Sequence, residues 1–218
     1  FSYLPLNHIA ERVVVEFTAF RFGGTMSFAE SMDTFAKNLQ DTQPTVFFAV
    51  PRIWTKFQMG ILSKVPQEKL TKLLKIPLLS WVLKNKFKKT LGLSKARAIV
   101  SGAAPLQESL RAWYRKIGIL ITNGYGMTEN CAITTHLEPY MMGKAGSVGI
   151  AQPEVELKID SETSEILMRG PFVMKEYYKQ PELTAEVIKD GWLHTGDQGH
   201  LDEEGFLFIT GRVKDIFK

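Results

Sequence analysis

The sequence has one cysteine, Cys131, among its 218 residues, and no apolar run as long as a membrane span. One cysteine cannot form an internal disulfide, which fits a reducing compartment. A membrane-crossing helix needs about twenty consecutive apolar residues. The N-terminus also lacks the basic and then apolar order of a secretory signal peptide. We therefore expect a soluble, cytoplasmic protein.

Acidic residues are scarce in one part of the chain. Residues 64–97, the basic tract, contain nine lysines and one arginine but a single acid, Glu68, and so carry a net charge of +9. The whole chain carries only +4, which leaves −5 for the remainder. Six leucines between residues 70 and 83, with Trp81 and Phe87, make the tract amphipathic, and Pro77 interrupts it.

Two interpretations of the basic tract follow. Lysines opposite Trp, Phe and Leu suit a helix pair at a membrane surface or at the access route for an acyl chain, which would give a peripheral membrane contact. The alternative is a helical hairpin with a solvated lysine face and with the leucines and Trp81 turned inward. We favour this hairpin because amphipathic helices packed on a core are far more common.

The middle of the chain contains an apolar run, residues 119–122, that passes into Asn123-Gly124-Tyr125-Gly126-Met127-Thr128-Glu129. This order predicts a buried strand that ends in a tight loop, where open α/β sheets bind ligands. The loop offers an aromatic face for a base, a hydroxyl for a phosphate oxygen and a carboxylate for Mg²⁺. Spacing alone fits a surface turn with an ordinary acid equally well.

Strand-like and helix-like segments alternate through the first part of the chain. The expected strands are residues 1–6, 45–50 (ended by Pro51) and 96–100, and the expected helices follow a capping box at residues 27–30 and cover residues 106–117. The first of these helices would place Phe28, Met32, Phe35 and Leu39 on one face. This alternation predicts an α/β fold with βαβ units on a parallel sheet, over residues 1–138.

Beyond Pro139 the pattern changes to an antiparallel one. Residues 154–159 and 165–169 alternate in polarity around a polar turn, which predicts a β-hairpin. A short helix at 181–188 and a strand at 206–210 complete a barrel-like β subdomain over residues 139–211. Gly143, Gly146 and Gly149 are interpreted as turn glycines because no strand-to-helix context supports a phosphate loop. Asp197, between Gly196 and Gln198, is expected in a turn.

The stretch Tyr125-Gly126-Met127-Thr128-Glu129 resembles the adenylate-binding motif of the AMP-forming acyl-CoA synthetases, the acyl-adenylate-forming superfamily. Five more segments resemble motifs of that superfamily in the same order: residues 1–12, 50–52, 101–106, 192–197 and 211–215. The forms Leu-Pro-Leu-x-His-x-x-Glu-Arg and Val-Pro-Arg are most similar to the long-chain fatty acid branch. Together these motifs span nearly the whole chain.

The resemblance implies a role for each matching residue. Gly102, Ala103 and Ala104 would line the adenine site, where Tyr125 packs on the ring beside Gly126. Asp197 would bind the ribose hydroxyls with help from Arg212, since a carboxylate accepts from a diol and a guanidinium donates to it. The remaining assignments are Thr128 to phosphate, Glu129 to Mg²⁺, His8 to the region of the carboxylate substrate, Lys214 to an inter-domain hinge at residues 212–218, and Lys218 to a family lysine just past it.

The implied reaction has two steps, in which a long-chain fatty acid and ATP give acyl-AMP and coenzyme A then displaces AMP. No nucleic acid partner is expected. Two alternatives stay open: an adenylating ligase for another carboxylate, aryl or amino acid, and a non-catalytic nucleotide- or lipid-binding module. The family's phosphate loop would precede Phe1, and its C-terminal domain with the catalytic lysine would follow Lys218. We therefore expect an internal fragment that is inactive alone.

Overall fold

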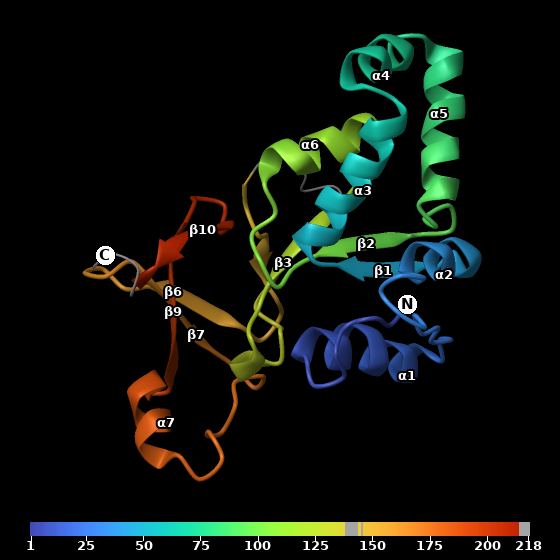
Figure 1. Ribbon diagram of the computed structural model, residues 1–218. Coiled ribbons are helices and arrows are strands. Elements are labelled where there is room, and N and C mark those ends of the chain that lie inside the picture. Colours follow the sequence, from blue (N-terminus) through green and yellow to red (C-terminus); the bar gives the residue numbers. More distant parts are fainter. Residues whose placement is uncertain (138–143, 145, 214–218) are drawn as a thin grey trace. The chain divides into compact units, whose positions relative to one another are not determined.

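The computed structural model describes residues 1–137, 144 and 146–213 (Figure 1). The chain forms two compact units, residues 1–122 and residues 123–218. Within the described residues, no helix combines the length and the apolar character needed to cross a bilayer.

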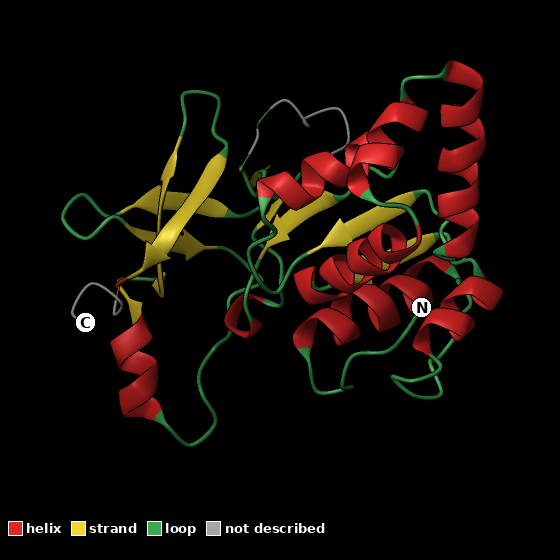
Figure 2. Ribbon diagram, turned by 45° about the horizontal axis from the view of Figure 1, so that its top comes forward, coloured by secondary structure: helices red, strands yellow, loops and turns green. Residues whose placement is uncertain are grey.

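The first unit is built on two parallel strands, as the sequence predicts. Strand β1 (Val46–Ala49) pairs with β2 (Ala98–Ser101) so that Val46 lies opposite Ala98. Helices lie on both sides of these strands (Figure 2). The helices between β1 and β2 are α3 (Pro51–Lys64), α4 (Gln67–Leu74) and α5 (Pro77–Thr90), and α6 (Glu108–Lys116) follows β2. The predicted βαβ connection and the helix after the second strand are therefore confirmed.

Proline and tryptophan organise the start of α3. Pro51 ends the strand and occupies the first helical turn, where a missing N–H leaves no hydrogen bond unmade. One turn later Trp54 is fully buried, and its indole N–H donates to the Ala49 carbonyl at 3.1 Å. The Tyr114 hydroxyl of α6 donates to the Trp54 carbonyl at 2.5 Å, and the two rings meet edge to face. These contacts join β1, α3 and α6 into one core.

The N-terminal predictions were partly wrong. Residues 1–6 contain no strand, only a single bridge between Ser2 and Phe28. Ser2 donates to the Ser27 carbonyl and accepts from the Ala29 N–H, so the backbone after Ser27 is extended and cannot start a helix. Helix α2 (Phe35–Thr42) begins later, which leaves Phe28 58% and Met32 54% exposed. Between Ser2 and Ser27, the chain forms a π-helix, η1 (Glu11–Phe17), which continues into α1 (Thr18–Phe22).

The second unit is antiparallel, as predicted. Strand β3 (Thr122–Tyr125) begins at the last residue of the first unit, and the pairs β3–β4 and β4–β5 are antiparallel, with β4 (Thr135–His136) and β5 (Ile150–Ala151). A larger sheet has the order β10-β9-β7-β6, with β6 (Glu156–Ile159), β7 (Glu165–Arg169), β9 (Trp192–Leu201) and β10 (Leu207–Arg212). Helix α7 (Pro181–Val187) and β8 (Ile188–Lys189), which pairs with β9, complete the unit.

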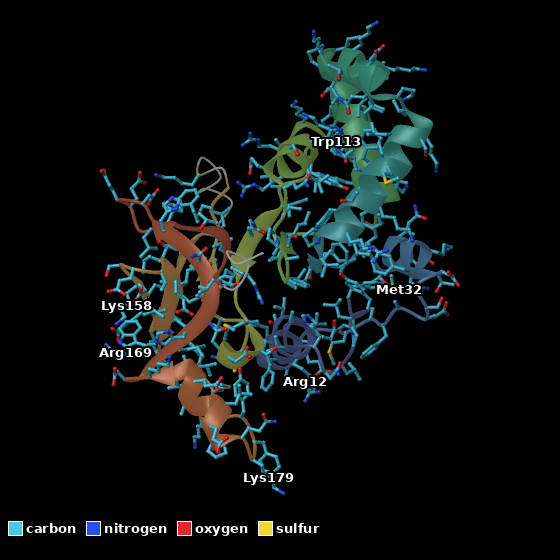
Figure 3. The ribbon with its side chains drawn as sticks, turned by 60° about the vertical axis from the view of Figure 1, so that its left-hand side comes forward. Arg12, Met32, Trp113, Lys158, Arg169 and Lys179 are labelled. Carbon is cyan, nitrogen blue, oxygen red and sulfur yellow. The ribbon has the colours of Figure 1, made fainter. Side chains whose placement is uncertain are left out.

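The predicted hairpin is formed by β6 and β7, with Glu156 opposite Arg169. The Asp160 carboxylate shapes the turn between them by accepting from the backbone N–H groups of Glu162 and Thr163. On the outer face, the Lys158 ammonium and the Arg169 guanidinium, both labelled in Figure 3, lie 4.2 and 4.8 Å from the centre of the Trp192 ring. Cation–π contacts thus hold the exposed face of this hairpin against β9.

Two predicted loops are strands in the structure. In the central apolar run, Ile119 and Ile121 are fully buried but Leu120 is 44% exposed. The strand itself is β3, so Gly124 and Tyr125 are paired with β4. Asp197 lies within β9 and is 9% exposed, so it is not in a turn. Of the three predicted turn glycines, Gly143 lies outside the described residues.

Candidate active site

Tyr125, Asp197 and Arg212 form one hydrogen-bonded group in the second unit. The Tyr125 hydroxyl donates to Asp197 Oδ2 at 2.7 Å, and Arg212 Nε pairs with Asp197 Oδ1 at 2.9 Å. Asp197 and Arg212 are register partners on the adjacent strands β9 and β10. Residues that the sequence places 72 and 15 positions from Asp197 therefore converge on its two carboxylate oxygens.

The surroundings keep Tyr125 neutral and Asp197 oriented. Burial, and then the adjacent Asp197 carboxylate, raises the pKa of the Tyr125 phenol above its ordinary value. The Tyr125 ring packs on a small apolar cluster of Val148, Ile166 and Leu207. The Asp197 N–H donates to Thr195 Oγ1 at 3.1 Å. The arrangement presents an oriented carboxylate beside a largely exposed guanidinium, a pair suited to a vicinal diol.

Thr128 and Glu129 lie on a short 3₁₀ turn, η2 (Thr128–Asn130), directly after β3. Asn130 fixes this turn from inside, because its Oδ1 accepts from the Met127 N–H at 2.9 Å and its Nδ2 donates to the Ile133 carbonyl at 3.0 Å. Thr128 remains exposed. The motif's second glycine is packed against the returning chain: a Cβ on Gly126 would lie 2.3 Å from the Ala132 carbonyl carbon. Only glycine fits there.

Glu129 is held by two contacts that no sequence pattern predicts. The Tyr177 hydroxyl donates to Glu129 Oε1 at 2.7 Å, and the Met174 N–H donates to the Glu129 carbonyl at 2.6 Å. Burial and the Glu129 carboxylate raise the pKa of Tyr177 to about 12, so the phenol stays a donor at neutral pH. Tyr177 lies 48 residues beyond Glu129 and outside every recognised motif, so only the fold could reveal this pair.

The loop predicted to line the adenine site lies in the first unit, directly after β2. Ala103 has a positive φ of 64°, a conformation that residues with a Cβ rarely adopt. Strain of this kind concentrates at binding sites, and an alanine keeps its cost low. Gly102 is buried, whereas Ala103 and Ala104 are exposed, so these two small side chains face outward.

His8 lies in the same unit, immediately before η1. Its Nδ1 accepts a hydrogen bond from the Ala10 N–H at 3.2 Å, and its carbonyl accepts from the N–H groups of Glu11 and Arg12. His8 therefore shapes the start of the helical segment, while its ring is only half-buried. Its role near a carboxylate substrate remains a prediction. The predicted hinge residue Lys214, and Lys218, lie outside the described residues.

A magnesium ion at Glu129 would have few ligands from the protein itself. In the described ranges, no group of three or more His, Cys, Asp or Glu side chains is placed to hold a metal. Magnesium bound with a nucleotide does not need one, because one or two carboxylates and the substrate phosphates suffice. Tyr177 occupies Glu129 Oε1, and Oε2 takes no hydrogen bond from the described residues. One carboxylate oxygen of Glu129, which follows Thr128 on the same 3₁₀ turn, fits such an ion.

A profile of a protein family described as AMP-binding enzyme matches residues 1–178. The chain belongs to the AMP-binding enzyme family. This match covers the motifs from His8 to Glu129 and also includes Tyr177. The recognition made from the six sequence motifs is therefore confirmed at the level of the family.

Similar proteins of this family come from bacteria and plants. The protein fadD11 of Mycobacterium tuberculosis, which carries a fatty-acid–CoA ligase name, is 34% identical over 99% of this chain and 43% of its own length. Long chain acyl-CoA synthetase 4 of Arabidopsis thaliana is 32% identical over all of this chain and 38% of its own. The chain thus spans about two fifths of the curated relatives that it matches.

Solved structures with the same fold include two kinds of synthetase. A fatty acyl CoA synthetase of M. tuberculosis superposes with a TM-score of 0.73 at 27% identity, over 98% of this chain and 39% of that one. The o-succinylbenzoate CoA synthetase of Bacillus subtilis, solved with ATP and a magnesium ion, gives 0.69 at 27% identity, over 98% and 42%. Both support the α/β fold with an antiparallel second part.

Proposed function

We propose that this chain is the nucleotide-binding part of a long-chain fatty acid–CoA ligase. The intact enzyme would join a fatty carboxylate to the α-phosphorus of ATP, release pyrophosphate, and transfer the acyl group from AMP to the thiol of coenzyme A. The observation that carries the proposal is the convergence of Tyr125 and Arg212 on Asp197. Family membership gives that group its nucleotide context.

Each candidate site residue of the second unit has a defined role in this proposal. The Asp197 carboxylate accepts hydrogen bonds from the ribose hydroxyls, while Arg212 donates to the ribose oxygens and Tyr125 fixes the carboxylate. Thr128, exposed at the start of η2, donates to a phosphate oxygen. Glu129 holds a magnesium ion, which would neutralise phosphate charge when bound.

Adenylation of this type demands alignment and charge neutralisation more than covalent help from the protein. The single cysteine, Cys131, therefore has no nucleophilic part. In the first unit, the exposed Ala103 and Ala104 leave room for a flat base, and His8 lies on the segment assigned to the carboxylate substrate. Coenzyme A completes the set of substrates.

A long-chain fatty acid is the preferred substrate because relatives at 30% identity or more carry fatty-acid or long-chain acyl-CoA names. A second candidate is an aromatic carboxylate. Similarity of fold supports an aromatic carboxylate as well as it supports a fatty acid. The B. subtilis o-succinylbenzoate CoA synthetase matches with a TM-score of 0.72 at 26% identity. Assay of the full-length protein with palmitate, benzoate and o-succinylbenzoate distinguishes these acids.

Nucleotide binding can be tested on the chain itself by calorimetric titration with AMP. Asp197→Asn should weaken AMP binding by about tenfold or more, because it removes a charged hydrogen-bond acceptor. The matched control is Asp190→Asn, an exposed residue with a φ of 51° that asparagine tolerates well. Equal AMP affinity in the wild type and both variants would contradict the assignment.

A further inference from the structure

The end of the α4–α5 hairpin exposes an unusual amount of apolar surface. Leu78 is 73% and Trp81 66% exposed, and Ile76, Leu79 and Val82 are also exposed. All five residues lie in the first two turns of α5 or just before it, and this set is called the hairpin tip. Figure 1 shows α4 and the start of α5 at the end of the first unit that is farthest from β1 and β2.

This arrangement corrects one part of the favoured interpretation of the basic tract. A helical hairpin does form, and Leu70 of α4 and Phe87 of α5 are buried as expected. Trp113, labelled in Figure 3, covers the inner side of α4 and donates from its indole N–H to Gln67 Oε1 at 2.8 Å. The hairpin is therefore anchored without the tip. Trp81 and the tip leucines are exposed and are not among the residues that pack on the core cluster.

Positive charge surrounds the tip on both sides in the sequence. Lys69, Lys72 and Lys75 precede it and are exposed, and Lys86 and Lys89 follow it on the outer side of α5. Along the outer side, helical spacing places Leu78 and Val82 in line with Lys89. An apolar end with a basic flank and an interfacial tryptophan is the pattern of segments that lie in the headgroup region of a bilayer.

A second exposed apolar surface in the same unit lacks this charge pattern. Phe17, Phe20 and Phe22 are all exposed on η1 and α1. Their neighbours in the chain are of mixed sign: Arg12 pairs with Glu16, and between residues 10 and 24 the only other basic residue is Arg21. Charge complementarity to a negative surface therefore distinguishes the hairpin tip from this aromatic face.

We propose that the hairpin tip docks on anionic membranes, with Leu78 and Trp81 inserted among the lipid headgroups and the flanking lysines on lipid phosphates. The net charge of +9 in the basic tract draws the hairpin to the surface, and insertion of the tip then makes binding resistant to salt. This proposal does not depend on the ligase activity. It adds a partner, a negatively charged lipid bilayer, to the substrates of the enzyme.

The primary experiment is co-sedimentation of the chain with vesicles of phosphatidylcholine containing about one third phosphatidylserine. The wild type should bind these vesicles and leave pure phosphatidylcholine vesicles largely unbound. Changing Lys72, Lys75, Lys86 and Lys89 together to glutamine should weaken binding about a hundredfold at low salt. The matched control changes four exposed lysines elsewhere, Lys116, Lys175, Lys179 and Lys189, and should lose much less.

Insertion is tested by removing apolar surface. Leu78→Ala with Trp81→Ala should reduce binding about tenfold and abolish the part that resists about 0.3 M salt. The control pair, Phe20→Ala with Phe22→Ala, removes exposed apolar groups from the aromatic face and should bind like the wild type. Because Trp81 and Leu78 are largely solvent-exposed, these changes leave the core intact.

Tryptophan fluorescence gives a direct readout of depth. Of the four tryptophans, Trp54 and Trp113 are buried, and Trp192 is partly buried beneath two cationic side chains of the second unit, so Trp81 should dominate quenching by brominated lipids. Trp81→Phe should keep vesicle binding but lose that quenching. The full-length protein should behave in the same way in both assays.

Three results would overturn the proposal. The first is an equal loss of vesicle binding in the variant with the hairpin lysines substituted and in the variant with the control lysines substituted. The second is binding without quenching of Trp81, which would mean that another surface meets the lipid. The third is concentration-dependent self-association that Trp81→Ala abolishes while lipid binding is unaffected, which would assign the tip to a second copy of the chain.

Discussion

At the scale of single residues, Asp197 is the point where the sequence and the fold meet. Its two carboxylate oxygens are engaged by Tyr125 and Arg212 at 2.7 and 2.9 Å, so its orientation is set within the protein. A bound ribose would meet a carboxylate that is already placed and would lose little entropy in ordering it. Removing either partner of this carboxylate, Tyr125 or Arg212, should therefore lower the affinity for the nucleotide.

Removing only the hydroxyl of Tyr125 tests this orientation. Tyr125→Phe keeps the ring and its packing but leaves Asp197 Oδ2 without its donor. A hydrogen bond to a charged group contributes about 1.5–3 kcal/mol, so AMP affinity should fall about tenfold or more. Calorimetric titration with AMP measures the change. Tyr3→Phe, which removes a hydroxyl bonded to the Val50 N–H in the first unit, serves as control.

Tyr177 is expected to act through Glu129 and is a positioning residue. Tyr177→Phe should leave AMP affinity without magnesium unchanged, because no ribose contact is involved. Magnesium raises the affinity for ATP, and in the variant this increase should be smaller by about three- to tenfold. The reason is that Glu129 Oε1 loses the donor that orients it. ATP titrations of the chain with and without magnesium supply this difference. The neighbouring Tyr178→Phe should match the wild type, and an equal loss in both variants would refute the role.

At the scale of elements, α3 shows how one residue joins several layers. Trp54 is fully buried and lies edge to face with Phe47 of β1 and Tyr114 of α6. Trp54→Ala should lower the free energy of unfolding by about 3–5 kcal/mol, because it leaves a large cavity among these rings. Trp81→Ala, in α5, should change it by about 0.5 kcal/mol or less, since Trp81 is 66% exposed. Urea denaturation followed by circular dichroism compares the two.

The elements also show what local pattern can and cannot predict. The buried residues of helix α6 recur with helical spacing, and the half-buried residues of strand β6 alternate with exposed ones, so both elements follow from periodicity. Strand β7 was also expected to alternate, but Ile166, Leu167 and Met168 are buried in succession. Helix α2 was predicted to start seven residues early. The capping signal at Ser27 is overridden by backbone pairing with Ser2, a contact between segments 25 residues apart. Pairing across such distances leaves no trace in local sequence.

At the scale of the whole molecule, buried phenols should limit stability in alkali. Burial raises the pKa of Tyr3 to about 12, and it also raises the pKa values of Tyr114 and Tyr125. The unfolded chain loses these protons near pH 10, before the folded one does. The folded state then binds more protons, so stability should be full below about pH 10 and should fall as the pH rises toward about 12.

Thermal unfolding monitored between about pH 8 and 12 tests this expectation. The melting temperature should stay level to about pH 10 and then decline. Tyr3→Phe should reduce the slope of the decline, because one of the raised groups is removed. A decline that begins near neutral pH would point to a different group.

The candidate site was predictable in its parts and only partly in its assembly. Motif resemblance selects Tyr125, Asp197 and Arg212, and the fold brings these three together. Tyr177 and Asn130 were missed. Each acts through a hydrogen bond to a motif residue, and residue type alone does not indicate such a bond. The hairpin tip was misjudged for the opposite reason. Its composition matches a buried stripe, and only the fold decides which side of α5 faces inward.

The close approach of Gly126 to Ala132 has an evolutionary consequence. Alanine is the smallest change that a glycine codon can make to a chiral residue, and even its methyl group would lie 2.3 Å from the Ala132 carbonyl carbon. Gly149 faces a stricter limit, with 1.7 Å to the His136 carbonyl oxygen. Neither glycine can therefore be replaced even by alanine without a shift of the backbone, whichever acid a relative activates. Invariance of these glycines among relatives would then record backbone packing and would carry no information about substrate choice.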